Sequence, residues 1–215
     1  MPARLQPLAS DLQRIFGARL ISVVAYGDLE GEDRDGVPTL ALVQQLTFQD
    51  LAACVPLAPG WRKTGCAVPL ILTRDEFLRT LDVFPLEYGD IIAHHIVVAG
   101  DDPFAGVAVS EVDLRRACEL QVKSHLIHLR EGYVENGVRP GSIARMIAAS
   151  APALRALAGN LERLDPDVVL RAGITPELLS EIAAAGSSTI AEPSALLARY
   201  VAAIERLWQH VDRWR

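Results

Sequence analysis

The chain has 215 residues, of which 50% are apolar and 22% charged, and its formal net charge is −6. This length is enough for one large domain or two modest ones, each with a buried core. The acidic balance argues against a broad surface for nucleic acid or anionic membranes, although a local basic pocket stays open. No apolar stretch reaches the roughly 20 residues of a membrane span, and the start has no signal-peptide core. We therefore expect a cytoplasmic protein.

Three cysteines, Cys54, Cys66 and Cys118, lie far apart in the sequence. They show no paired spacing of the kind that zinc sites use. We expect buried, reduced thiols rather than a redox or metal role.

The first predicted elements are a helix and two strands. Apolar residues at helical spacing predict a helix over residues 3–16 that ends at Gly17. The β-branched run that follows predicts a strand, which stops at Gly27, where a backbone without Cβ can bend sharply or lie close to a ligand. A second strand is predicted after Pro38. Side chains alternate along it, so Thr39 and Ala41 share one face.

Thr47 is predicted to cap a short helix, and a Pro/Gly-rich connection follows it. This connection holds Trp61, Arg62 and Lys63. A basic pair beside an indole can contact a phosphate and a base, so Lys63 is a candidate for cofactor binding. The alternative is a solvated loop with Trp61 folded onto the core. A buried strand over residues 69–73 and a helix capped by a Thr-x-x-Glu box come next.

Residues 84–92 are predicted as a strand on which Glu87 shares a face with Gly89 and Ile91. A carboxylate in an apolar strand needs a reason, because burying an unpaired charge is costly. Glu87 therefore forms either a salt bridge with a neighbouring element or part of a functional site. Asp82 is the second candidate, although it falls at the end of the preceding helix.

The strand, glycine turn, loop and second strand resemble the core of the nucleotidyltransferase-like superfamily, the DNA polymerase β type. Such proteins carry a Gly-Ser turn and a second strand with two alternating aspartates. This chain has Tyr26-Gly27-Asp28 at the turn and Thr39-Leu40-Ala41-Leu42 on the strand. The resemblance implies a cleft in which the carboxylates hold the divalent metals that position a nucleoside triphosphate. Here both carboxylates are missing, and a hydroxyl and a methyl group cannot replace two negative charges.

The same resemblance implies roles for three further residues. Gly27 and Asp28 occupy the turn that contacts phosphate in the superfamily, although an aspartate repels an unmetallated triphosphate. Glu87 is the candidate for the third carboxylate, which completes the metal site or acts as the catalytic base. No metal ligand set is assigned. Roughly residues 70–135 also resemble a bacterial group of uncharacterised nucleotidyltransferase-domain proteins, through a Phe-Pro-Leu-Glu segment and the pair His94-His95. Adjacent histidines point in different directions and make a poor metal pair.

The C-terminal half is predicted to be helical. A long helix over residues 111–133 carries His125 on its apolar face, with His128 one turn on. His125 is interpreted as a packed core histidine, with a ligand or proton-transfer role shared with His128 as the alternative. Further helices are predicted over residues 142–149, 152–164 and 167–171, from Thr175, and from residue 192 or 193 onwards. Together they form a helical bundle.

The predicted class is α+β, with a small mixed sheet and flanking helices over residues 1–108 and the bundle over residues 109–215. Three functional hypotheses follow. The first is a catalytically inactive protein whose cleft binds a small ligand, a nucleotide or a partner. The second is an active enzyme that transfers a nucleoside monophosphate from ATP or another triphosphate to a small molecule or protein. In this case Mg²⁺ is the cofactor, and Glu87 and loop acids are its ligands. The third is a regulatory, antitoxin-like subunit that docks through its aromatic C-terminal helix. A homo-oligomer is compatible with each hypothesis.

An HEPN-type ribonuclease is excluded by its motif, since the gap from Arg116 to His125 is too wide.

Overall fold

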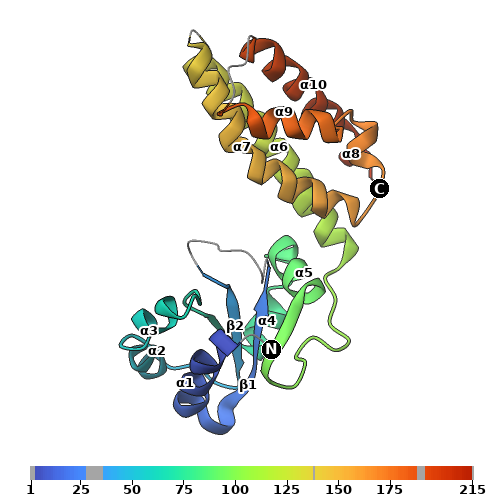
Figure 1. Cartoon of the computed structure of the whole chain (residues 1–215). Coiled ribbons are helices and arrows are strands. Elements are labelled where there is room, and N and C mark those ends of the chain that lie inside the picture. Colours follow the sequence, from blue (N-terminus) through green and yellow to red (C-terminus); the bar gives the residue numbers. More distant parts are fainter. Residues whose placement is uncertain (1–2, 28–35, 138, 188–191, 215) are drawn as a thin grey trace. The chain divides into compact units, whose positions relative to one another are not determined.

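The computed structural model describes residues 3–27, 36–137, 139–187 and 192–214. The chain divides into two compact units, Met1–Ser110 and Glu111–Arg215. Figure 1 shows a sheet with its helices in the first unit and helices in the second. Within the described ranges, no helix is long and apolar enough to cross a membrane.

The first unit is built on a four-stranded mixed sheet with the order β3-β2-β1-β4. Its strands are β1 (Leu20–Tyr26), β2 (Thr39–Val43), β3 (Leu70–Thr73) and β4 (His95–Gly100). Strand β1 is antiparallel to both β2 and β4, and β2 is parallel to β3. The mixed sheet and the α+β class expected from the sequence are confirmed.

Helices surround this sheet. They are α1 (Gln6–Phe16), α2 (Phe48–Cys54), α3 (Ala58–Lys63), α4 (Arg74–Arg79) and α5 (Pro85–Ala93), with short 3-10 helices at Ala3–Leu5 and Gly17–Arg19. Two starts follow directly from capping boxes that the sequence shows. The hydroxyl of Thr47 accepts a hydrogen bond from the backbone N–H of Asp50 (3.3 Å), and Thr73 does the same for Glu76 (3.1 Å).

The two faces of the sheet are covered by different helices, as Figure 1 shows. Because side chains alternate along a strand, Val23 and Ala41 pack against α1 and the buried Trp61 of α3. Their neighbours Val24 and Leu40 pack on the opposite face, against α4 and α5. The central strands β1 and β2 are therefore covered on both faces, which explains why β2 is buried along its whole length. The strand expected to be buried over residues 69–73 is instead the partly exposed β3.

The strand predicted over residues 84–92 is wrong, because this segment forms α5. Pro85, Tyr88 and Ile91 are buried at a spacing of three residues, which places them on one face of a helix. Proline suits the first turn of a helix, where its missing N–H has no partner to lose. The fourth strand is β4 instead, which the prediction did not include.

The connection that holds Trp61, Arg62 and Lys63 is also helical. Pro59 lies in the first turn of α3, and the indole N–H of Trp61 donates to Asp11 Oδ2 at 2.9 Å. Trp61 is folded onto the core, as one of the two interpretations expected, but on a helix rather than on a loop.

The second unit is a bundle formed by α6 (Glu111–Asn136), α7 (Pro140–Glu162), α8 (Val168–Arg171), α9 (Pro176–Ala184) and α10 (Pro193–Val211). The two helices predicted over residues 142–149 and 152–164 are one continuous helix, α7, with Pro152 inside it. Ile147, Ala151 and Leu154 are buried on both sides of Pro152. This packing outweighs the hydrogen bond that the proline removes.

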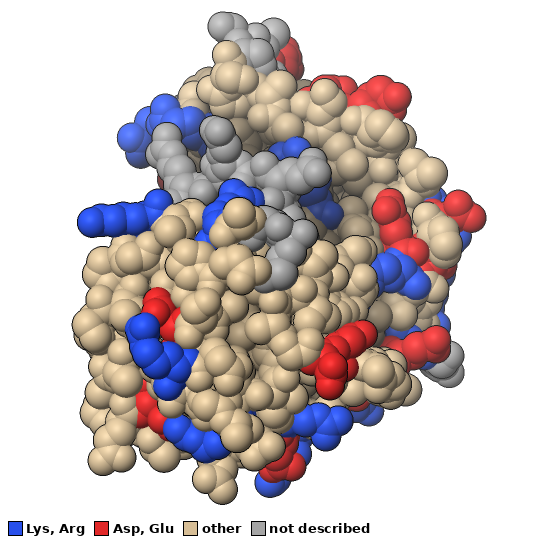
Figure 2. All heavy atoms as spheres, turned by 60° about the horizontal axis from the view of Figure 1, so that its bottom comes forward, with Lys and Arg blue, Asp and Glu red and all other residues tan. Residues whose placement is uncertain are grey.

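Most of the face in Figure 2 consists of residues without formal charge, and basic and acidic groups are both present on it.

All three cysteines are buried: Cys54 and Cys66 lie in the first unit, and Cys118 lies in the second.

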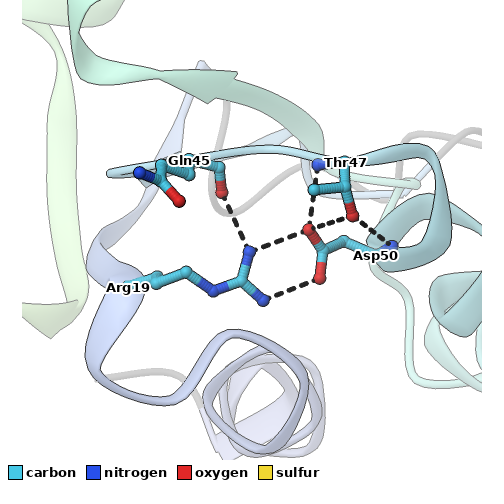
Figure 3. Close-up of polar contacts among 4 residues, drawn as sticks. All are labelled: Arg19, Gln45, Thr47 and Asp50. Carbon is cyan, nitrogen blue, oxygen red and sulfur yellow. Dashed lines mark hydrogen bonds and ion pairs between the residues drawn. The ribbon is translucent and has the colours of Figure 1, made fainter.

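An ion pair ties the start of β1 to α2 (Figure 3). The guanidinium of Arg19 donates to both carboxylate oxygens of Asp50, at 2.7 and 2.8 Å, and to the carbonyl of Gln45 at 3.2 Å. Asp50 also accepts from the backbone N–H and the hydroxyl of Thr47. These bonds, the one from Arg19 first, hold the pKa of the Asp50 carboxyl well below its usual range.

Candidate functional site

A pocket of about 590 Å³ opens in the first unit at one end of the sheet. Tyr26, the last residue of β1, lines it together with Leu70 and Leu72 of β3. These strands meet there because β1 is antiparallel to β2 while β3 is parallel to it, so β1 ends where β2 and β3 begin. Helices α4 and α5 form the other walls. The pocket therefore adjoins the turn at Gly27.

The pocket has an apolar floor and an acidic rim. Leu70, Leu72, Tyr88 and Ile91 contribute its carbon surface, and the rings of Tyr88 and the buried Phe77 stack at 4.5 Å. The rim carries three carboxylates, and every charged side chain among the described lining residues is acidic: Glu76, Glu87 and Asp90. Apolar walls with a few polar groups are typical of ligand-binding pockets.

The three rim carboxylates differ in their partners. Asp90 lies 3.1 Å from the Nδ1 of His94, and Glu76 accepts the backbone N–H of Thr73 in the capping box. Glu87 is exposed and makes no hydrogen bond or ion pair with any described residue. The salt bridge that was one explanation for Glu87 is therefore not found in the described part of the chain.

Tyr26 brings a phenol to the same pocket. Its hydroxyl is half-buried, and burial, followed by the nearby Tyr88, raises the pKa of Tyr26 above its ordinary value. The phenol thus stays protonated near neutral pH and can donate a hydrogen bond into the pocket.

The residues predicted to bind a cofactor are only partly brought together. Gly27 follows β1 with a φ of +74°, a conformation that favours glycine, and so forms the turn expected there. Asp28 lies outside the described residues. Lys63 is exposed at the end of α3, whose core residue packs on the opposite face of the sheet, and it is not among the described lining residues of the pocket. Glu87 and the turn at Gly27 share one pocket, and Lys63 lies outside it.

The residues of β2 and β3 do not fit a divalent metal. Thr39 and Ala41 are 1% and 0% exposed, on the face packed against α1. Ile71 lies beside Ala41 on β3, and no residue of β3 is a carboxylate. Hard divalent cations take oxygen ligands, chiefly carboxylates. Among the described residues, no group of three His, Cys, Asp or Glu could hold a metal ion; the loop acids Glu30, Glu32, Asp33 and Asp35 lie outside that set.

The adjacent histidines point apart, as expected. His94 is exposed and contacts Asp90, whereas His95 is largely buried, 3.1 Å from the carbonyl of Ile92 and edge-on to Phe104. They share no ligand position.

A second polar cluster lies in the core of the bundle. Ser150 Oγ donates to the carbonyl of Ile147 (2.7 Å), so it accepts from the Tyr200 hydroxyl at 3.1 Å. Tyr200 Oη in turn accepts from the Nε2–H of His125 at 2.5 Å. Burial lowers the pKa of His125 and raises that of Tyr200 to about 12. Ser150, Tyr200 and His125 are thus neutral side chains, and each of them is hydrogen-bonded within the cluster.

His125 is therefore a packed core histidine, as the sequence indicated. His128 lies 2.7 Å from the carbonyl of Ser124 on its own helix and does not join the cluster. The sequence did not reveal Tyr200 and Ser150 as partners, because they stand 75 and 50 positions from the atoms they contact.

No family model matches this sequence, and no curated protein is similar to it at a significant level. Among solved structures, the fold is similar to that of spectinomycin adenyltransferase AAD(9) from Enterococcus faecialis, determined with ATP and spectinomycin. The two chains are 12% identical, the match covers 98% of each, and the TM-score is 0.52. At this identity the likeness shows the fold alone: a nucleotidyltransferase-like α+β structure with a helical C-terminal region.

Proposed function

We propose that this chain is a nucleotidyltransferase-fold protein without metal-dependent transferase activity, and that its pocket at the end of the sheet is a binding site for a small ligand or a partner. The observation that carries the proposal is the burial of Thr39 and Ala41 on β2. A catalytic metal needs exposed oxygen ligands at these positions. Here they are core positions.

The neighbouring strand supports the same conclusion. Ile71 stands beside Ala41 in the parallel pairing of β2 with β3, so a third ligand on that strand is absent as well. Glu87, the remaining candidate, projects from α5 into the pocket on the other face of the sheet. Thr39 and Glu87 therefore belong to opposite sides of a buried sheet, and together they do not form one metal site.

The aromatic C-terminal helix gives no support to the regulatory-subunit hypothesis. Trp208 lies beneath Lys123, whose Nζ is 3.5 Å from the ring centroid, and Tyr200 belongs to the polar cluster of the core. These two aromatic side chains therefore make contacts within the bundle itself.

Calorimetric titration with ATP and GTP, with and without Mg²⁺ or Mn²⁺, tests the proposal, combined with an assay for transfer of labelled nucleotide. We expect weak binding that the metal does not change, and no transfer. Metal-dependent micromolar binding that Glu87→Ala abolishes would overturn the proposal. The exposed Asp75→Ala variant on α4 is the matched control, since Asp75 pairs with the exposed Arg79 and is not among the described lining residues of the pocket.

A further inference from the structure

Strand β3 forms one edge of the sheet. Among the described strands it pairs only with β2, so the outward backbone groups of Leu70–Leu72 have no strand partner. The N–H of Thr73 at its end is occupied by Glu76. An edge strand with unpaired N–H and C=O groups is a template for one more strand.

Apolar side chains are exposed next to this edge. Val68 is 47%, Leu70 39% and Phe84 45% exposed. Leu70 and Leu72 belong both to the edge strand and to the pocket lining. Because side chains alternate along a strand, a segment laid along β3 would direct every second side chain to the pocket.

The charge of the rim identifies the kind of segment. Glu76, Glu87 and Asp90 surround the opening, and the described lining residues include no basic side chain. A second copy of this chain would bring the same carboxylates together across the edge, and like charges oppose such pairing. Lys or Arg side chains match the sign of the rim, and their alternation places them on the pocket side of an added strand.

We propose that β3 binds an extended, basic segment of a partner protein by strand addition, with alternate basic side chains entering the pocket beside Glu87. The proposal rests on the proposed function only in taking the pocket as a binding site. Because β3 has four residues and follows Pro69, the added ladder is short. The complex is therefore a transient one.

A fluorescein-labelled peptide, Lys-Val-Lys-Val-Lys-Val, tests the proposal by fluorescence anisotropy with the full chain. Two controls accompany it: Glu-Val-Glu-Val-Glu-Val, of opposite charge, and Lys-Pro-Lys-Pro-Lys-Pro, of equal charge but without alternate backbone N–H donors. We expect saturable binding of the Lys-Val peptide, at least about tenfold tighter than either control. Hydrogen exchange at Leu70–Leu72 should slow in its presence.

The Glu87→Gln variant should bind the Lys-Val peptide about two- to fivefold more weakly than wild type, which is the effect of one partly exposed charge pair. The Asp75→Asn variant, changed outside the pocket lining, should bind this peptide as tightly as wild type. Equal binding of the Lys-Val and Lys-Pro peptides would show charge attraction alone and overturn the proposal, as would an absence of binding. Neither of these two results would argue for transferase activity, so the proposed function would stand. Metal-dependent transfer, in contrast, would overturn the proposed function, and the peptide measurements would still decide the binding proposal.

Discussion

Two hydroxyl groups buried in the same sheet have different surroundings. Ser22 Oγ on β1 donates to the carbonyl of Ala99 at 3.1 Å, whereas Thr39 Oγ1 on β2 has no partner among the described residues. A buried polar group without a hydrogen bond costs about 1–3 kcal/mol, and a satisfied one contributes about 1 kcal/mol. The two side chains should therefore respond to removal in opposite directions.

Thr39→Val, which keeps the side-chain shape, should stabilise the first unit by about 1 kcal/mol, because it removes a buried hydroxyl without a partner. Ser22→Ala should destabilise it by about the same amount. Urea denaturation at neutral pH measures both. Destabilisation by Thr39→Val would show that this hydroxyl has a partner in solution.

Asp50 joins a helix cap to a bidentate ion pair, so its removal affects both. Asp50→Asn should lower the free energy of unfolding by about 2–4 kcal/mol at pH 7. The pKa of Asp50 is lowered in the folded protein. Its contribution is therefore present above the unfolded pKa, near 4, and is lost as the pH falls below it.

Denaturation of wild type and Asp50→Asn at pH 7, 4 and 2.5 measures this dependence, and the difference between them should narrow only below pH 4. Asp75→Asn is the control, because its pair with Arg79 is exposed on both sides and 3.7 Å long. It should change the stability by less than about 0.5 kcal/mol. A pH-independent effect of Asp50→Asn would contradict the assignment.

In the second unit, His125 has the opposite kind of effect, because the folded state is more stable when its imidazole is neutral. The pKa of His125 in the folded protein lies below the ordinary histidine value of about 6.5, so the unfolded chain takes up a proton first as the pH falls. Stability is thus present above pH 6.5 and is lost as the pH falls toward the folded pKa. His125→Gln keeps an N–H donor for Tyr200 but does not titrate.

The stability lost between pH 7.5 and 5 should therefore be smaller in His125→Gln than in wild type, as thermal unfolding would show. His128→Gln, at an exposed position of the same helix, should reduce the pH dependence less than His125→Gln does, because burial is the larger cause of the lowered His125 pKa and the nearby His128 is the second. Equal pH dependence of all three proteins would argue against His125 as the source.

At the scale of elements, Pro152 is the feature of α7 that costs stability. It lies at an exposed position inside a continuous helix, where proline removes a backbone hydrogen bond. Pro152→Ala should stabilise the protein by about 1–3 kcal/mol. Pro140, in the first turn of the same helix, has no such bond to lose, and Pro140→Ala should give no gain. Chemical denaturation distinguishes the two; equal gains would mean that unfolded-state effects dominate.

Local signals explain which helices the sequence predicts. The starts at Thr47 and Thr73 follow from side-chain caps, and the helices from Thr175 and from residue 192 or 193 are also predicted correctly, each with a proline in its first turn. Helices α3 and α5 begin with a proline too, but their segments are predicted from the sequence as a loop and a strand. For α5, the short apolar run fits a strand and a helix equally well. Pro85 was the residue that separated them.

The candidate site was predictable to a similar extent. Glu87 was singled out as an acid inside an apolar segment, and it does line the pocket beside Tyr26. The strand predicted for Glu87 is wrong, because the proline in the first turn of α5 marks a helix start that the strand prediction does not take into account. The burial of Thr39 was not predictable either, because it depends on the helix that covers that face.

At the scale of the whole molecule, the two units have separate cores. We expect them to unfold in separable steps, because the described ion pairs and the polar cluster lie within one unit or the other. Asp50→Asn should shift only the step of the first unit, and His125→Gln only the step of the second. Hydrogen exchange followed by mass spectrometry at intermediate urea measures this. A single cooperative loss of protection in both units would contradict it.

The buried thiols make each of these steps chemically visible. Burial raises the pKa of Cys54, and raises that of Cys118 to about 11, so little thiolate is present at these two residues in the native chain to react with an alkylating reagent. Opening of the first unit releases Cys54 and Cys66, and opening of the second releases Cys118. The three thiols thus serve as site-specific probes of unfolding, and the order in which they are alkylated shows which half of the chain opens first.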